Sequence, residues 1–192
     1  PPPATGVVHV VAPGETLAAG IDVAAGRQRA PGARLAYVTP SHQFPTGVTM
    51  PAGRRTELLR WAAAAPGRYL IEDDYDSEFR FDGRPLPSLQ GLDESGRVIY
   101  ISTFSKSIAP AIRIAYMVLP AALVPLFRER FGSYSSTVSR FEQQTLYRFI
   151  AGGHYARHLA RMRTAYRARR DALCGGLRAI GWDVPDSHGS MF

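Results

Sequence analysis

Two short apolar runs on either side of one helix constrain the fold of this chain more than any other feature. Residues 35–38 and 69–72 are short and apolar enough to be buried strands. Between them, Pro51 marks the expected start of a helix, and Pro66 with Gly67 marks its end. A strand, a helix and a second strand form a βαβ unit, which implies a parallel strand pair and a right-handed crossover. The sequence therefore predicts an α/β fold with a mainly parallel sheet.

The helix between these strands has two chemically different faces. Its apolar face carries Leu58, Leu59, Trp61 and Ala62. Its charged face carries Arg54, Arg55, Glu57 and Arg60. We expect the apolar face to cover the sheet and the charged face to meet solvent.

Further elements follow from the same patterns. Apolar runs predict strands at residues 7–11, 98–101 and 113–119. Turn residues predict loops at residues 26–32 and 82–96, and residues 16–25 suit one or two helical turns. From residue 121 onward the chain is helical in character, over residues 121–130, 137–151 and 154–180. In the second of these helices the expected core residues are Phe141, Leu146, Phe149 and Ile150.

Lys106 is the one lysine among 23 lysines and arginines. An arginine side chain stays protonated in a protein, whereas a lysine can lose its proton and act as a nucleophilic amine. A Schiff base is the obvious use for such an amine, although a single solvated surface lysine is the alternative. The strand before Lys106 ends in a hydroxyl-rich segment that includes Thr103 and Ser105. Hydroxyls at the carboxyl end of a strand suit a phosphate, and Arg113 could add a bidentate contact.

The strand at residues 69–72 ends in the acidic run Asp73-Asp74-Tyr75-Asp76. Two neighbouring strand ends would then carry a lysine with hydroxyls and a carboxylate with a phenol. This set of groups suits a cationic aromatic cofactor with a phosphate tail. The alternative is a solvated, turn-forming cluster of aspartates.

Three motifs resemble one known family in both spacing and order. TPSHQFPTG, IEDDYDSEFRF and STFSKSIAPAIRIAY are similar to the pyridoxal-phosphate half of MocR-type regulators, a branch of the GntR family. That half resembles a class I/II aminotransferase of fold type I, and the similarity runs from about Leu35 onward. It implies the fold type I large domain, with pyridoxal 5'-phosphate as cofactor, followed by helices that lead into a small domain.

The resemblance also assigns roles to individual residues. Lys106 would form a Schiff base with the cofactor, and Asp73 would pair with the pyridine nitrogen and keep it protonated. Tyr75 would hydrogen-bond the ring hydroxylate. The phosphate would be held by Thr103, Ser105 and Arg113.

One departure from ordinary aminotransferases lies in the segment Gln43-Phe44-Pro45-Thr46-Gly47. Ordinary members carry Asn-Pro-Thr-Gly, and Phe44 takes the place of the asparagine. The phenylalanine form resembles the regulator branch. In the same loop, His42 is more typical of a structural or solvated histidine than of a catalytic base.

The charge of the chain raises nucleic acid as a partner, because the net charge is +7. Its arginines concentrate in the helix at residues 154–180 and do not form a stripe with interleaved aromatic residues. A solvated helix face between two domains therefore explains them better than a DNA-binding surface. No apolar run is long enough to span a bilayer, and no secretion signal is recognisable, so we expect a cytoplasmic protein without membrane contact.

The resemblance divides the chain at Pro120. Residues 1–119 would be part of the pyridoxal-phosphate-binding large domain, and residues 120–192 would be linking helices and the start of the small domain. The expected winged helix and the arginine for a substrate carboxylate are not recognisable in the sequence, so we expect a fragment of a longer protein. DNA would then be bound only through a winged helix outside this chain, and the resemblance favours a homodimer.

Three hypotheses follow. The first is the effector-sensing half of a MocR/GntR-type regulator that captures an amino acid or another small amine. The second is a stand-alone aminotransferase that moves an amino group between an amino acid and a 2-oxo acid, with Lys106 acting twice. The third is a cofactor-free dimerisation module. The sequence leaves open whether transaminase turnover takes place.

Overall fold

The computed structural model describes residues 23–43, 47–81 and 86–184. These residues form two compact units. Unit 1 contains the described residues up to Tyr75 together with Leu86–Ser102 and Tyr116–Arg130. Unit 2 contains the described residues of Asp76–Pro85, Thr103–Ala115 and Phe131–Phe192. The strand expected at residues 7–11 lies outside the described residues.

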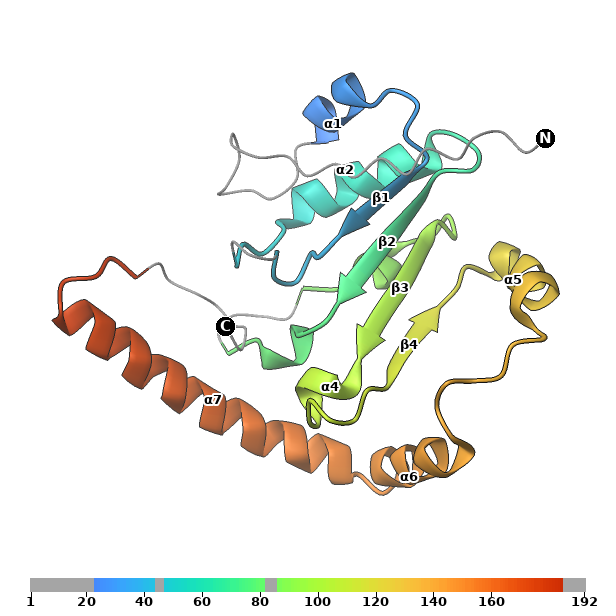
Figure 1. Cartoon of the computed structure of the whole chain (residues 1–192). Coiled ribbons are helices and arrows are strands. Elements are labelled where there is room, and N and C mark those ends of the chain that lie inside the picture. The colour runs from blue at the N-terminus through green and yellow to red at the C-terminus, as the bar shows by residue number, and fades with distance from the viewer. Residues whose placement is uncertain (1–22, 44–46, 82–85, 185–192) are drawn as a thin grey trace. The chain divides into compact units, whose positions relative to one another are not determined.

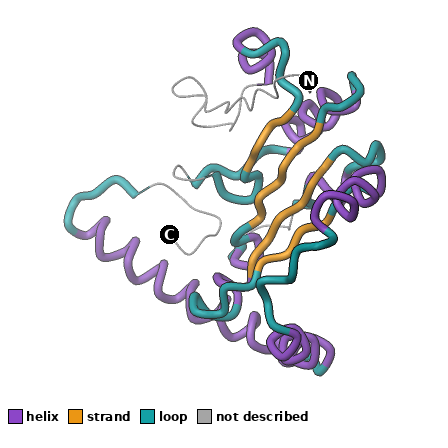
Figure 2. Tube along the Cα trace, turned by 45° about the vertical axis from the view of Figure 1, so that its right-hand side comes forward, coloured by secondary structure: helices purple, strands orange, loops and turns teal. Residues whose placement is uncertain are grey.

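A four-stranded sheet in the order β1-β2-β3-β4 is the centre of unit 1. Its strands are β1 (Leu35–Val38), β2 (Tyr69–Asp74), β3 (Val98–Thr103) and β4 (Ala115–Val118). β1 pairs with β2 and β2 with β3 in parallel, whereas β4 runs in the opposite direction (Figure 1). The predicted α/β class and the predicted βαβ unit are confirmed. Figure 2 shows the four strands side by side.

One face of the sheet carries the core of unit 1. Helix α2 (Ala52–Ala63) packs on this face, and Leu58, Trp61 and Ala62 are buried as expected. The remaining buried members of this cluster come mainly from the sheet and its loops: Ala36, Val38, Met50, Leu70, Leu89 and Val98. Because side chains alternate along a strand, the buried positions of β2 are Leu70, Glu72 and Asp74. The odd-numbered positions of β2 lie on the opposite, more open face.

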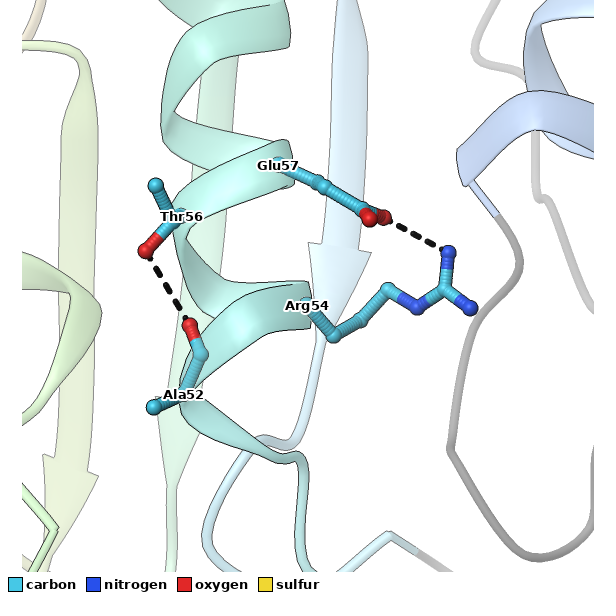
Figure 3. A network of polar contacts seen from close by, with 4 residues as sticks. All are labelled: Ala52, Arg54, Thr56 and Glu57. Atoms are coloured by element: carbon cyan, nitrogen blue, oxygen red, sulfur yellow. Dashed lines mark hydrogen bonds and ion pairs between the residues drawn. The ribbon is translucent and has the colours of Figure 1, made fainter.

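The side of α2 that faces away from the core carries polar side chains, which can remain in contact with water (Figure 3). Arg54 donates to Glu57 Oε2 at 2.7 Å, one helical turn away. Thr56 Oγ1 donates to the carbonyl of Ala52 at 3.1 Å. The proline that opens this helix is its N-cap and not its first residue, a difference of one position from the prediction.

Arg55 overturns the prediction that it belongs to the solvated face, because it is only 1% exposed. Its guanidinium donates to the carbonyls of Met50 at 3.0 Å, Pro87 at 2.8 Å and Pro40 at 2.9 Å. The five N–H donors of an arginine can bond several loop carbonyls at once, and these hydrogen bonds offset the free-energy cost of removing the guanidinium from water. Binary patterning missed this role because it treats every charged residue as solvated.

Glu72 is the second buried charged group of this region, with no exposed surface. It accepts hydrogen bonds from the backbone N–H groups of Leu89 at 2.8 Å and Gln90 at 2.9 Å. Burial raises the pKa of the Glu72 carboxyl, while these two bonds and the attraction of Arg55 act in the opposite direction. We call Arg55 and Glu72, with the segment 87–90 that both contact, the polar clamp.

The raised pKa predicts a pH-dependent stability. The folded protein favours protonated Glu72, so this contribution is full below the ordinary pKa of 4.5 and is lost as the pH rises through the folded pKa. Glu72→Gln cannot ionise. Relative to that of the wild type, its free energy of unfolding should therefore increase as the pH rises from about 4.5 towards neutrality, which means that the variant becomes relatively more stable. Urea unfolding at a series of pH values measures this difference, and a constant difference would contradict the prediction.

Two of the predicted loops contain helices. Helix α1 (Val23–Arg29) occupies most of what was expected to be the loop at residues 26–32, and only its start overlaps the predicted helical turns. Helix α3 (Leu89–Leu92) lies within the second expected loop, and Ser88 caps it by accepting from the N–H of Gly91. Turn-forming residues conceal such short helices, because serine and aspartate also favour helix N-caps.

The later helices lie where the sequence predicted them, but some of their apolar residues are less buried than predicted. They are α5 (Val124–Phe131), preceded by a 3₁₀ turn at Ala121–Leu123, then α6 (Arg140–Ala151) and α7 (His154–Ala179). A capping box of Ser139 and Glu142 begins α6. Phe141 and Ile150, expected in the core, are 81% and 43% exposed, so that part of the prediction is wrong. Periodicity identifies the apolar face of a helix but not what covers it.

Unit 2 is held together around Tyr155 of α7. Its ring packs against Phe104 of the short helix α4 (Phe104–Ser107) and against Phe149 of α6. Its hydroxyl donates to Glu78 of the 3₁₀ turn η1 (Ser77–Phe79) at 3.2 Å. Phe79 also packs edge-on against Tyr166. Helix α7 is therefore in contact with α4, which carries Lys106, and with η1, which follows Tyr75 in the chain.

Candidate cofactor site

Asp73 lies near the carboxyl end of β2, on the sheet face opposite the core. The register pairs Tyr37 with Ile71, so Tyr37 and Asp73 share that face two positions apart. The hydroxyl of Tyr37 donates a hydrogen bond to Asp73 Oδ2. Burial and the neighbouring Asp73 carboxylate raise the pKa of the Tyr37 phenol above its ordinary value. The phenol therefore stays protonated and acts as a donor.

Asp74, the next residue, points to the core face and has a different environment. It is 5% exposed. Ser41 donates to its Oδ1 at 2.6 Å, and Tyr100 donates to its Oδ2 at 2.7 Å. Its backbone carbonyl accepts from Ser102 Oγ at 2.7 Å. Asp74 therefore ties β2 to β3 and to the loop after β1.

Tyr75 follows directly and contacts that same loop. Its hydroxyl donates to the carbonyl oxygen of His42 at 2.8 Å. His42 itself is 2% exposed, so it is a buried histidine of the loop and not a solvated one. The loop continues with Gln43, whose N–H donates to the carbonyl of Val48 at 2.9 Å. Phe44 lies outside the described residues.

The lysine-bearing segment belongs to unit 2. Thr103 is the N-cap of α4: its hydroxyl accepts from the N–H of Ser105 at 3.1 Å and donates to the carbonyl of Ile114 at 3.1 Å. Lys106 is half-buried in this turn, between the buried Ser105 and Ser107. The hydroxyl of Ser107 is buried and has no hydrogen-bond partner among the described residues. The hydroxyls around the lysine are thus largely withdrawn from solvent.

Arg113 is exposed and has an unusual backbone. Its φ of 21° is positive, the one such value for a non-glycine residue in the described part of the chain. An L-residue in this region is strained, and strain of this kind concentrates at functional positions. It lies two residues before β4 in the chain, and its role as an anion-binding arginine stays a prediction.

The structure distributes the predicted site residues over the two units. Asp73 and Tyr75 belong to unit 1, whereas Thr103, Ser105, Lys106 and Arg113 belong to unit 2. Ser102, the last residue of its segment in unit 1, pairs with Asp74 in the sheet and precedes Lys106 by four residues in the chain. The sequence prediction missed Tyr37. Parallel register of the two expected strands, taken with side-chain alternation, could have placed Tyr37 beside Asp73.

Comparison with known proteins identifies the family. Residues 28–192 match the family described as Aminotransferase class I and II, and the chain belongs to this family. The crystal structure of kynurenine aminotransferase from Pyrococcus horikoshii is similar, with a TM-score of 0.74 and 32% identity over 83% of this chain and 41% of that chain. The predicted fold type I large domain is confirmed.

Two curated relatives also confirm the resemblance stated from the motifs. YdeL of Bacillus subtilis (strain 168), named as an uncharacterized HTH-type transcriptional regulator, is 52% identical over 136 residues. MocR of Rhizobium meliloti, named as a probable rhizopine catabolism regulatory protein, is 44% identical over 147 residues. The matches cover 71% and 75% of this chain but only 29% and 30% of YdeL and MocR. The chain therefore spans less than a third of the length of these relatives.

Family membership implies pyridoxal 5'-phosphate as the cofactor, and the donor set of this chain fits it. A carboxylate with one hydrogen-bonded oxygen suits a protonated ring nitrogen, and a primary amine suits an aldehyde. Arg113 and the hydroxyls near Lys106 supply the type of donors that a phosphate needs. The partnerless Ser107 hydroxyl leaves one further donor in that segment. Within the described residues, no helix has the length and apolar character needed to cross a bilayer.

Proposed function

We propose that this chain is the pyridoxal-phosphate-binding, effector-sensing part of a MocR/GntR-type transcriptional regulator. The observation that carries the proposal is the level of similarity to regulators. YdeL and MocR are 52% and 44% identical, whereas the aromatic-amino-acid aminotransferase 1 of Thermococcus litoralis is 31% identical. Phe44, which replaces the asparagine of ordinary aminotransferases, supports the same choice.

The predicted residue roles remain proposals. Lys106 would bind the cofactor covalently, and Asp73 would hold the pyridine nitrogen in its protonated form. Thr103, Ser105 and Arg113 would hold the phosphate. Pyridoxal phosphate supplies an electron-withdrawing ring that captures amines and stabilises negative charge next to the bound nitrogen. Because the hydroxyl of Thr103 already caps α4, its share in phosphate binding is smaller than that of Arg113 in this proposal.

Tyr75 connects the proposed cofactor site with the loop after β1, because its hydroxyl is hydrogen-bonded there. A phenol has one O–H to donate, and here it is donated to the His42 carbonyl. To donate to the ring oxygen of the cofactor, Tyr75 has to give up this bond to the loop. The next residues form η1, which Tyr155 holds on α7. We therefore propose that a change of the hydrogen-bond partner of Tyr75 shifts the backbone of η1, which follows it in the chain and contacts α7 through Tyr155.

The partners follow from the same proposal. The effector would be an amino acid or another small amine, and DNA would be bound through a winged helix outside this chain. The active form would be a homodimer in the cytoplasm. We keep the division at Pro120 as a proposal, with the large domain before it and the linking helices after it.

One experiment separates the three hypotheses. The full-length protein is mixed with pyridoxal phosphate, its visible absorption is recorded, and a panel of amino acids and amines is added. A sensor should show a cofactor band that one or a few amines change reversibly, without release of a 2-oxo acid. Steady production of a 2-oxo acid would favour the stand-alone aminotransferase. A folded protein with no cofactor band would favour the cofactor-free dimerisation module and contradict the proposal.

A further inference from the structure

The Tyr37 hydroxyl is bound to the one carboxylate that the proposed function assigns to the cofactor. It donates to Oδ2, and it is the one hydrogen-bond partner of the Asp73 carboxylate among the described residues. The other oxygen, Oδ1, accepts no hydrogen bond from the described residues. Tyr37 is 54% exposed, so packing of its ring in the core does not account for its position.

The adjacent aspartate provides a comparison within the same strand. Both carboxylate oxygens of Asp74 accept a hydroxyl, one from Ser41 and the other from Tyr100. Asp74 is buried and has no oxygen without a donor, as expected for a structural group. Asp73 has one donor and one open oxygen on the more open face of the sheet. This pattern is typical of a carboxylate that is oriented by a neighbour and left able to accept one more hydrogen bond.

We propose that Tyr37 is a positioning residue for Asp73, and that its hydroxyl holds one carboxylate oxygen so that the other can face the pyridine nitrogen of pyridoxal phosphate. A carboxylate oxygen held towards the ring can accept a hydrogen bond from the protonated pyridine nitrogen, and a protonated ring withdraws electrons most strongly. This inference rests on the proposed function, because it requires the cofactor to bind at Asp73.

The test uses pyridoxal phosphate labelled with ¹⁵N at the ring nitrogen and the full-length protein. The ¹⁵N chemical shift of the bound cofactor reports whether the ring nitrogen carries a proton. In Tyr37→Phe we expect the resonance to move towards that of neutral pyridine, and the affinity for pyridoxal phosphate to fall about tenfold, as for the loss of one hydrogen bond to a charged group. Thermal unfolding of the cofactor-free variant checks that it is folded.

Tyr100→Phe is the matched control, since it removes the same hydroxyl from the neighbouring Asp74. It should leave the ¹⁵N resonance of the bound cofactor unchanged, even where it lowers the thermal stability. An unchanged resonance in Tyr37→Phe, with the cofactor bound, would overturn the role of Tyr37 and leave the proposed function intact. A folded wild type that binds no pyridoxal phosphate would overturn both together.

Discussion

Lys106→Arg should abolish covalent attachment of pyridoxal phosphate to this chain. Arginine keeps the positive charge at this position but has no amine that can lose its proton and attack an aldehyde. After reduction with borohydride, the wild type should carry one pyridoxyl group on Lys106, and the variant should carry none at that position. Peptide mapping by mass spectrometry measures the modification, and the expected loss is complete.

A lysine placed elsewhere on the chain is the control for this experiment. Because Lys106 is the one lysine of this chain, a lysine introduced at another position is the one lysine of the Lys106→Arg variant. Arg128→Lys in the Lys106→Arg background puts a lysine on the exposed surface of α5. That lysine should remain unmodified under the same conditions. Equal labelling at position 128 would show that the amine at 106 has no special reactivity, and the proposed role of Lys106 would then fail.

Arg55→Met should lower the free energy of unfolding by about 3–5 kcal/mol, since each buried carbonyl left without its donor costs about 1–3 kcal/mol. Three loop carbonyls would lose their donor, and the Glu72 carboxyl would lose the attraction of the guanidinium. A loss of this size is a large part of the stability of a typical domain. Urea unfolding followed by the fluorescence of Trp61, which is buried on the same helix, measures it.

Arg54→Met is the matched control, one residue away on the outer side of α2 (Figure 3). It removes an ion pair with Glu57, whose side chain is 51% exposed. Such pairs contribute little, so the loss should stay below about 1 kcal/mol. If the two variants were equally stable, the polar clamp would not stabilise the fold in the way that its hydrogen bonds suggest.

The parts of the fold that follow from periodicity were predictable from the sequence. Strands β1 to β3, helix α2 and helix α7 were expected close to their observed bounds, because long or strongly apolar patterns leave few alternatives. Helices α1 and α3 were not, since short helices depend on caps and on tertiary contacts more than on pattern. The burial of Arg55 was missed for a related reason: it depends on three carbonyls from two loops that are far apart in the sequence.

The site was predictable in its residue types more than in its contacts. The motifs identify Lys106, Asp73 and Arg113 as candidates, and the family match agrees with the cofactor they imply. The motifs do not show that Thr103 caps a helix or that Tyr75 contacts the His42 carbonyl. Nor do they show that Tyr37 donates to Asp73. These contacts depend on the register of the sheet, and motif spacing along a single segment does not encode register.

The alternation of β2 has a consequence for mutational scanning of this family. Asp73 and Asp74 are chemically identical and adjacent, yet one faces the open side of the sheet and the other faces the core. A screen that scores only regulatory output would rank both as essential. Screens that record protein abundance and ligand response separately should divide the pair, with Asp74 variants depleted in abundance and Asp73 variants present but unresponsive. The same division could be used to recognise ligand-facing acids in relatives for which no structure has been solved.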